Sequence, residues 1–381
     1  MDFELDEEHL TIREGIRKLA QSRIAPRADH YDKTGEYPWD DVKELAQNGY
    51  LGMTVPDEFG GLGADSLANA IVIEEVSRAD AAVGTIVDVH NTLAVDPLVR
   101  FGSQRLKEKY LPGLATVEIL GAYALTEPDA GSNAANQKTL AEKGEGEYIL
   151  NGRKIFISNG GVADIYVVYA VTDKSKGAKG ISAFVVEKDT PGVSFGPPED
   201  KMGIRASHTT EVILDNVHVP AENLVGQEGE GYKIALATLD KGRVGIAAQA
   251  VGILQAALDK SVKYAKEREQ FGQALAAFQA IQFKIAEMAM DLDAARLLTY
   301  RAAWLVDRPG RWSKETSMAK LFASTAAMKH TVQAVQIHGG YGYVREYGVE
   351  RLMRDAKITE IYEGTSEIQH VIISGFVLGD K

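Results

Sequence analysis

Proline is spread unevenly along this chain, and its distribution limits where long helices can form. After Pro220 the only proline is Pro309. Proline breaks a helix interior because it lacks an N–H and its ring collides with the preceding turn, so long helices are expected within residues 226–381. In the stretch 234–269, apolar residues recur at three- to five-residue spacing between lysines and glutamates, which predicts one long helix. A second is predicted over about 313–337, ending before a glycine pair.

A different pattern occupies the middle of the chain. Three runs there are rich in Val, Ile, Tyr and Thr and are bounded by Gly, Asp and Pro, which is typical of β-strands. Asn151-Gly152 stands between two further β-prone runs and predicts a tight hairpin turn. The segments before this region have helical periodicity. The chain is therefore predicted to be an α+β multidomain protein, with a helical domain at 1–117, a β domain at 118–225 and a helical domain at 226–381.

Composition excludes several classes of protein. The chain has no cysteine, which excludes disulfides, thiolate metal sites and cysteine nucleophiles. Its net charge is −12 and no basic stripe is present, so nucleic acid is not expected as a partner. No apolar run approaches the ~20 residues of a membrane span, and the acidic start lacks the features of a signal peptide. A soluble cytoplasmic protein without membrane contact is expected.

The common short motifs of nucleotide and metal chemistry are missing. The sequence has no P-loop, no GxGxxG after a predicted strand and no HExxH. A nucleotide cofactor would therefore not be held as in a Rossmann fold. The eight histidines are scattered, and no metal site is expected. His90 lies in an apolar, helix-like run; we interpret it as a packed core residue, with a ligand contact as the open alternative.

Three segments stand out from this background: GAYALTEPDAGSN at 121–133, LDKGRVGIAAQ at 239–249 and MRDAKITEIYEGTSEIQ at 353–369. The first gathers hydroxyls and a glycine in one loop, but such residues also populate ordinary turns. The second places Asp240 and Arg243 three apart, which is also the spacing of a solvated helix ion pair. The third holds Glu363 in a mixed aromatic and apolar setting, where burial can raise the pKa of a general base. A surface glutamate before a helix is the other interpretation.

Taken together and in this order, the three segments resemble the acyl-CoA dehydrogenase family over essentially the whole chain. YALTEPDAGS and IYEGTSEIQ are similar to its two signature regions, and LDKGRVGIAAQA and IHGGYGY are most similar to short-chain (butyryl-CoA) members. The resemblance implies an N-terminal helical domain, a central β-barrel or sandwich domain and a C-terminal four-helix bundle. It also implies FAD as cofactor, an acyl-CoA substrate, electron-transferring flavoprotein as electron acceptor and a homotetramer.

The same resemblance implies roles for individual residues, with Glu363 as the catalytic base. Residues implied to contact FAD within one subunit are Tyr123, Leu125, Thr126, Gly131, Ser132, Phe156, Ile157, Ser158, Thr365, Ser366 and Glu367. Those implied to reach the FAD of a neighbouring subunit are Arg268, Phe271, Gln279, Gln336, Gly339 and Gly340. Residues implied to bind the CoA ester are Ser132, Asp240, Arg243 and Gly364. Many members have Trp and Thr where this chain has Phe156 and Ser158, which keep an aromatic face and a hydroxyl.

The implied reaction converts a saturated acyl-CoA into a trans-2-enoyl-CoA, as in fatty acid β-oxidation. Glu363 would remove the proton α to the thioester while the β-carbon delivers a hydride to the flavin. Some relatives carry the base on the long helix instead, at the position of Gly242, and the glycine closes that alternative. Glutaryl-type relatives have an arginine in the acyl pocket, and the matching stretch 83–93 has none. Asp88 in this stretch is a departure that either faces solvent or shapes a pocket for a branched or alicyclic acyl group.

Other functions stay open at this point. The same active site would serve an enoyl-CoA reductase that works in the reverse direction with electrons from reduced flavoprotein. A dehydrogenase for a branched or alicyclic acyl-CoA fits the unexplained Asp88. An acyl-CoA oxidase is usually a longer chain, and a non-catalytic scaffold would have no need of Glu363, Arg243 and the 123–132 loop together.

Overall fold

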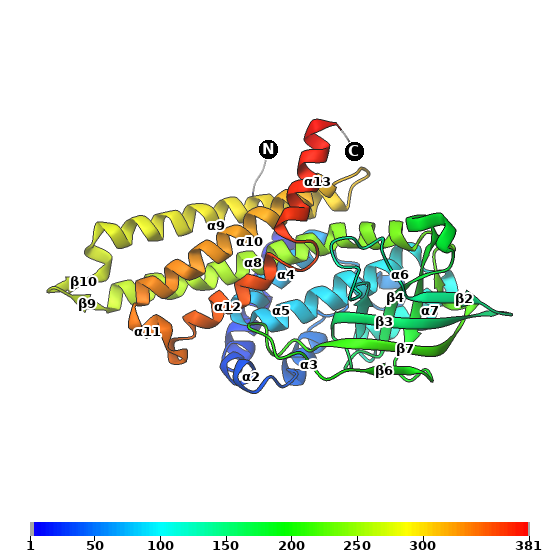
Figure 1. The fold of residues 1–381 in the computed structure, drawn as a ribbon. Helices are drawn as coiled ribbons and strands as arrows, with labels where there is room; N and C mark the ends of the chain where they lie inside the picture. The colour runs from blue at the N-terminus through cyan, green and yellow to red at the C-terminus, as the bar shows by residue number, and fades with distance from the viewer. Residues whose placement is uncertain (1–3, 380–381) are drawn as a thin grey trace.

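The computed structural model describes residues 4–379 (Figure 1). The outermost residues of the expected terminal domains, 1–3 and 380–381, lie outside this range. The N-terminal part is helical, as predicted, with helices α1 (Glu7–Leu19), α2 (Ala28–Thr34), α3 (Trp39–Gln47), α4 (Ser66–Ala79), α5 (Ala81–Asp88), α6 (Val95–Phe101) and α7 (Gln104–Thr116). Polar side chains define several helix starts: Asp65 accepts a backbone N–H of α4 and Ser103 one of α7.

The connection from α5 to α6 is a wide helical turn rather than a loop. Its residues, η3 (Val89–Ala94), form a π-helical segment that continues α5 directly into α6, and all six are buried. Such π-turns are frequent at functional sites. The segment therefore carries side chains into the interior of the molecule, where α8 passes.

The middle part is one mixed sheet of eight strands. The strands are β1 (Gly121–Ala124), β2 (Leu140–Lys143), β3 (Glu147–Ser158), β4 (Ile165–Val171), β5 (Ile181–Glu187), β6 (Val193–Phe195), β7 (Thr209–Pro220) and β8 (Leu224–Val225). Their order is β6-β7-β3-β2-β4-β5-β8, and β1 pairs in parallel with β4. Short β2 joins the two halves, and β1 contacts β3 as well. The sheet thus folds over on itself, in agreement with the expected β-barrel or sandwich.

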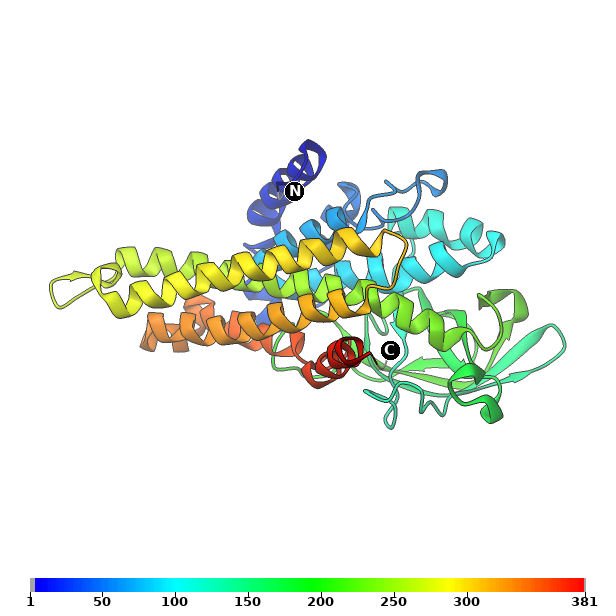
Figure 2. The same cartoon turned by 90° about the horizontal axis from the view of Figure 1, so that it is seen from above.

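The C-terminal part is built on three long helices that lie side by side along most of the molecule (Figure 2). Its helices are α8 (Gly231–Glu267), α9 (Gln279–Val306), α10 (Ser313–His338), α11 (Gly340–Tyr343), α12 (Val349–Thr359) and α13 (Ser366–Leu378). Helix α12 packs against both α8 and α10 and completes a four-helix bundle. The hairpin of β9 (Glu269–Gln270) and β10 (Gln273–Ala274) joins α8 to α9 at one end of the bundle (Figure 1). The two long helices expected from the sequence are confirmed.

One local prediction was wrong. Asn151 and Gly152 form no hairpin turn; both lie inside β3, which continues past them through a register shift against β7. Glycine is needed there because the residue before β2 approaches closely: a β-carbon on Gly152 would lie 2.4 Å from the Oγ1 atom of Thr139. The hairpin that joins β2 to β3 turns at residues 144–146 instead, where Gly146 adopts a φ of 74°.

Candidate active site

Glu363 lies in the short loop between α12 and α13, in an uncommon backbone conformation. Its φ is 52°, in the left-handed region that non-glycine residues rarely enter, and Gly364 follows at 95°. The loop is tied down on both sides: Lys320 Nζ of α10 donates to the Gly364 carbonyl at 2.7 Å, and Gln369 Nε2 of α13 donates to the same oxygen at 2.8 Å. The Tyr362 hydroxyl donates to Gln249 of α8. Contacts from three helices therefore hold the strained residue in place.

The Glu363 carboxyl group points into the interior, against α8. Its Oε2 atom is inaccessible to solvent and has no hydrogen-bond donor among the described residues. A β-carbon on Gly242 would lie only 2.1 Å from this oxygen and 2.8 Å from Leu93 of η3. Glycine at position 242 thus makes the space that the carboxyl occupies. The alternative of a surface glutamate is wrong.

Electrostatic surroundings raise the pKa of Glu363 well above its usual value. Burial is the main cause, and the negative charge of Asp88 adds to it. Lys320 and Arg243 act in the opposite direction, as nearby positive charges. A half-buried glutamate with a raised pKa and one enclosed oxygen without a donor has the properties of a general base or acid.

Asp88, which the sequence left without a role, is the last residue of α5 and is buried beside Glu363. Its side chain is 1% exposed, and neither of its oxygens has a donor among residues 4–379. A β-carbon on Gly245 would lie 1.8 Å from its Oδ1 atom. The pKa of Asp88 is raised, and burial of the side chain is the main cause. The solvent-facing alternative for Asp88 is therefore wrong.

Asp240 and Arg243 lie one turn apart on α8. Arg243 Nη1 donates to Asp240 Oδ1 at 2.5 Å, and the other Asp240 oxygen accepts from the Ser313 hydroxyl of α10 at 2.7 Å. Arg243 is 4% exposed, and its Nε has no partner in the described part of the chain. The pair is not a solvated surface ion pair, and Arg243 keeps an unused donor next to Glu363.

The loop that begins at β1 is fixed to the sheet by a buried lysine. Tyr123 lies in β1, and its ring packs on Tyr169 with centroids 5.1 Å apart. Lys154 Nζ of β3 donates to the Leu125 carbonyl at 3.2 Å and to Glu127 Oε1 at 2.7 Å. The Thr126 carbonyl accepts the N–H of the residue before Phe156. The loop and β3 are thus held side by side, while residues 131 and 132 at its far end are exposed.

Phe156 stands out from β3 because the strand bulges there. The register against β7 shifts between Lys154 and Ile157, and Phe156 has a φ of 55° and is 62% exposed. Ile157 is buried and Ser158 half-buried. Three further residues implied to contact FAD lie at the N-terminus of α13. Thr365 caps the helix through its hydroxyl, Ser366 begins it, and Glu367 is exposed.

The six residues expected to serve a neighbouring subunit do not reach this site within one chain. From Gly242 to Arg268, α8 rises about 39 Å at 1.5 Å per residue. The β9–β10 hairpin and α11 lie at that far end of the bundle, away from the β domain (Figure 1). Phe271 is 94% exposed on the hairpin tip. The group comprises Arg268, Phe271, Gln279, Gln336, Gly339 and Gly340, all exposed except the half-buried Arg268.

His90 has the role of a core residue. Its Nδ1 accepts the Gly121 N–H at 3.2 Å, so its Nε2 carries the proton and donates to the Leu114 carbonyl at 2.9 Å. The ring therefore joins the end of α7 to the start of β1. Burial lowers the pKa of His90 to about 4, so the ring stays neutral at pH 7.

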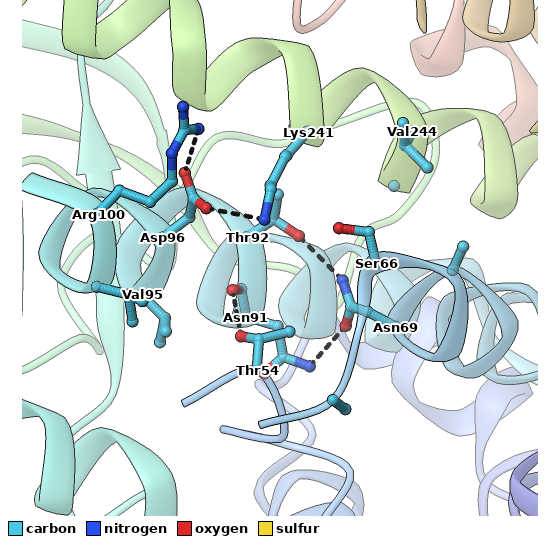
Figure 3. A pocket seen from close by; sticks show the side chains of 14 residues that line it. Thr54, Ser66, Asn69, Asn91, Thr92, Val95, Asp96, Arg100, Lys241 and Val244 are labelled. Atoms are coloured by element: carbon cyan, nitrogen blue, oxygen red, sulfur yellow. Dashed lines mark hydrogen bonds and ion pairs between the residues drawn. The ribbon is translucent and has the colours of Figure 1, made fainter. Parts of the chain in front are cut away.

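A cavity of about 90 Å³ lies between α4, η3, α6 and α8 (Figure 3). Its polar side chains satisfy one another: Asn69 donates to Thr92 and accepts from Asn91, and Asp96 pairs with Lys241 and Arg100. Glu363 does not line it. We therefore do not assign it as the place where the Glu363 carboxyl meets a ligand.

Comparison with known proteins agrees with the three-part architecture. Models of the acyl-CoA dehydrogenase N-terminal, middle and C-terminal domains match residues 6–118, 122–217 and 229–378. An acyl-CoA dehydrogenase of Bacillus subtilis (strain 168) is 52% identical over 98% of both chains. The chain belongs to the acyl-CoA dehydrogenase family. It is accordingly an oxidoreductase that acts on a CH–CH group, and the resemblance found in the signature segments is confirmed.

Solved structures of other family members are very similar to this dehydrogenase. Butyryl-CoA dehydrogenase from Megasphaera elsdenii is 46% identical, with a TM-score of 0.97 over 99% of this chain and 100% of that chain. A chain from the structural study of the electron transferring flavoprotein of Acidaminococcus fermentans is also 46% identical, with a TM-score of 0.98 and the same coverage.

FAD is the cofactor of acyl-CoA dehydrogenases, and the residues of this chain fit it. Phe156 presents an exposed ring, which a flat ring system can cover, beside the polar loop that contains Thr126 and Ser132. Thr365 and Ser366 place two hydroxyl groups at the N-terminus of α13, where the positive end of the helix dipole suits an anionic group. None of the helices in the described range is long and apolar enough to cross a membrane.

Proposed function

We propose that this acyl-CoA dehydrogenase oxidises a short-chain acyl-CoA to the trans-2-enoyl-CoA, with Glu363 as the base. The observation that carries the proposal is the Glu363 carboxyl: its Oε2 atom is enclosed without a donor and lies against Gly242, and the residue belongs to a tethered loop. The similarity to the butyryl-CoA dehydrogenase supports a short acyl chain.

In the proposed reaction, Glu363 accepts the proton α to the thioester at its carboxyl oxygen. FAD, when bound, supplies the acceptor for the hydride that leaves the β-carbon. The backbone N–H of Glu363 donates to no acceptor within residues 4–379, so it is free to stabilise charge that develops on the thioester oxygen. Such a donor typically contributes about 2.7–4 kcal/mol to lowering the barrier.

The CoA ester would be held on the α8 side of the site. Arg243 has a free Nε and a fixed geometry of donors suited to carbonyl and phosphate oxygens. Asp240 and Ser313 fix its orientation. Ser132 and Gly364 complete the proposed CoA contacts from the exposed loop and from the base loop.

The proposed flavin contacts divide into two groups. Tyr123, Leu125, Thr126 and Phe156 lie on the fixed loop and the β3 bulge of the same chain, with Gly131, Ser132, Ile157, Ser158, Thr365, Ser366 and Glu367 around them. The six residues at the far end of the bundle would serve the FAD of a neighbouring subunit, since about 39 Å of helix separates them from their own Glu363.

This division supports a homotetramer, as does a stripe of exposed apolar residues on α9. Phe283, Met290, Leu297 and Trp304 recur every seven residues and are at least half exposed. A heptad stripe opposite the buried face of a helix is typical of a second helix packing on it. We also propose electron-transferring flavoprotein as the electron acceptor, in view of the second structural neighbour, a role in fatty acid β-oxidation, and a cytoplasmic location.

The domain division remains part of the proposal: 1–117, 118–225 and 226–381. It is supported by the end of α7 at Thr116 before β1 and by the end of β8 at Val225 before α8.

Replacing Glu363 with glutamine tests the base. The amide has nearly the same shape but cannot accept a proton, so we expect turnover to fall by about 10²–10⁴-fold or more while FAD stays bound. The measurement is anaerobic bleaching of the flavin by butyryl-CoA, with the visible spectrum as the check of FAD content. Near-normal bleaching by E363Q would show that Glu363 is not the base.

The substrate is tested by the same bleaching with hexanoyl, octanoyl, isobutyryl, glutaryl and cyclohexanecarbonyl CoA esters. We expect butyryl-CoA to bleach fastest. A strong preference for octanoyl-CoA or for a ring substrate would overturn the short-chain assignment. The enoyl-CoA reductase alternative predicts that the reduction potential of the bound flavin lies below that of the enoyl-CoA/acyl-CoA couple. A redox titration of the holoenzyme measures this potential.

A further inference from the structure

Two carboxyl groups lie against neighbouring turns of α8, and two glycines one turn apart make the space that they occupy. Glu363 lies against Gly242, and Asp88 lies against Gly245; a β-carbon at either glycine would come within 2.1 Å of a carboxyl oxygen. Neither Asp88 oxygen, nor Glu363 Oε2, receives a donor from any other described residue. Within the described protein, the hydrogen bonds open to these oxygens are one from the Thr92 hydroxyl to Asp88 and one between the two carboxyls themselves, and the second requires one carboxyl to be protonated.

The Asp88 carboxyl and Glu363 Oε2 lie side by side out of reach of solvent, so ionising both groups is unfavourable, because the like charges repel and the low dielectric does not screen them. They titrate as a unit that holds one proton over a wide pH range. Burial raises the pKa of both groups; the hydrogen bond between them raises that of Glu363 and lowers that of Asp88, which a hydrogen bond from Thr92 also lowers. In the proposed pair the proton is accordingly placed on Glu363, and Asp88 carries the charge.

The groups that face the pair come from every surrounding element. They are Arg243 on α8, Lys320 on α10, Tyr123 on β1, Tyr362 on the base loop and Thr92 on η3. Arg243 is already paired with Asp240, and Lys320 donates to the Gly364 carbonyl rather than to either carboxyl. The positive charges of Arg243 and Lys320 stabilise a pair with one net negative charge. Neither side chain forms an ion pair with Asp88.

We propose that Asp88 is a positioning residue that shares one proton with Glu363 and thereby sets the pH range in which Glu363 acts as a base. This rests on the proposed role of Glu363. In the resting pair the O–H bond is on Glu363; moving that proton to Asp88 breaks it, forms an O–H bond on Asp88 and leaves Glu363 ready to accept the substrate α-proton. After the substrate C–H bond has broken, Glu363 is again protonated, and loss of the Asp88 proton restores the resting pair.

The first test is the pH dependence of kcat/KM in the holoenzyme. Asp88→Asn keeps the shape but removes the like charge, so the pKa of Glu363 falls and the acidic limb moves to lower pH, by about one unit or more. Asp41→Asn is the matched control, because Asp41 is also a buried carboxyl with a raised pKa but pairs with Arg27 in the N-terminal domain. An acidic limb that stays in place in D88N, or that D41N moves equally, would overturn the proposal.

A second test needs neither a folded variant nor turnover. Infrared spectra of the wild-type holoenzyme at pH 7, with ¹³C-labelled glutamate, should show a protonated-carboxyl C=O band that shifts with the label. Glutamate labelling separates Glu363 from buried aspartates with raised pKa values, such as Asp41, Asp80 and Asp355. No shifted band would overturn the shared proton.

The two tests also separate this inference from the proposed function. If E363Q keeps its turnover but lacks the infrared band, the pair exists and Glu363 is not the base. If E363Q loses turnover and the wild-type band is missing, Glu363 is the base and the pair does not share a proton.

Discussion

At the scale of single residues, Lys320 is the counterpart of Asp88. It is buried, and burial lowers its pKa to about 8, so it is mostly protonated at pH 7. Its charge favours the ionised form of Glu363, whereas Asp88 opposes it. The pKa of the base thus depends on a balance between one acidic and one basic neighbour.

Replacing Lys320 with methionine should therefore shift the acidic limb of kcat/KM to higher pH, opposite to D88N. We expect about half a unit to one unit, less than for a charge in direct contact, since Lys320 Nζ bonds to Gly364 rather than to the carboxyl. Lys320→Gln separates two effects: it keeps a donor for the Gly364 carbonyl but loses the charge. Both variants should show the shift, and only K320M should also loosen the loop and lower kcat. A shift to lower pH in either variant would contradict this account.

The residue that carries most of the new inference is one that sequence reasoning could not place. Glu363 was predictable because its surrounding segment resembles a family signature. Asp88 is far from Glu363 in sequence, and its burial depends on η3, on Leu93 and on two glycines of α8. Only the Gly242–Gly245 spacing, one helical turn, was visible in the sequence, and nothing there shows what faces those glycines.

At the scale of elements, the β-sheet shows why a local pattern can mislead. Asn-Gly favours a hairpin because both residues tolerate positive φ, yet in β3 the glycine is needed for close approach to Thr139. Long helices were easier to predict, because α8 and α10 are specified by many residues with the same periodicity. Tertiary packing overrode the turn preference of two residues in β3. It did not override the helical periodicity that many residues of α8 and α10 share.

The buried ion pair of Lys154 and Glu127 fixes the loop 123–132, which is proposed to contact the flavin, to strand β3. Both side chains are less than 5% exposed, so Lys154→Met leaves a buried carboxylate without its partner and should cost about 3–5 kcal/mol of the free energy of unfolding. FAD affinity should fall with it, because the Leu125 carbonyl loses its donor. Urea unfolding and release of FAD fluorescence measure the two effects.

Lys138→Met is the matched control for this variant. Lys138 pairs with Asp129 in the same loop, but both side chains are more than 60% exposed, and such surface pairs contribute about 0–1 kcal/mol. Adding Glu127→Gln to K154M should recover part of the lost stability, since it removes the stranded charge. Equal losses in K138M and K154M would contradict the proposed role of the buried pair.

At the scale of the whole molecule, three segments separated by more than 100 residues each meet at one point. β1 brings Tyr123, α8 brings Arg243 and the α12–α13 loop brings Glu363. Their order along the chain was visible in the sequence, and so were the three parts that carry them. The residues at the far end of the bundle, by contrast, gain a role only if a second chain lies there.

The assembly can be tested on the α9 stripe. Leu297→Glu places a charge in the middle of the heptad row of Phe283, Met290, Leu297 and Trp304, where its burial in an interface would be very unfavourable. We expect sedimentation equilibrium to show a tetramer for the wild type and smaller species for L297E. Because Phe271 and Gln279 would then no longer reach a neighbour's flavin, L297E should also lose FAD on gel filtration.

Leu10→Glu controls for the chemistry of the change, since Leu10 is a similarly exposed leucine on α1, outside the stripe. It should leave both mass and FAD content unchanged. A wild type that sediments as a monomer with FAD bound would refute the tetramer and the trans-subunit contacts together. An L297E variant that dissociates yet keeps its FAD would refute only the contacts, because the stripe would then hold the chains together without serving the cofactor.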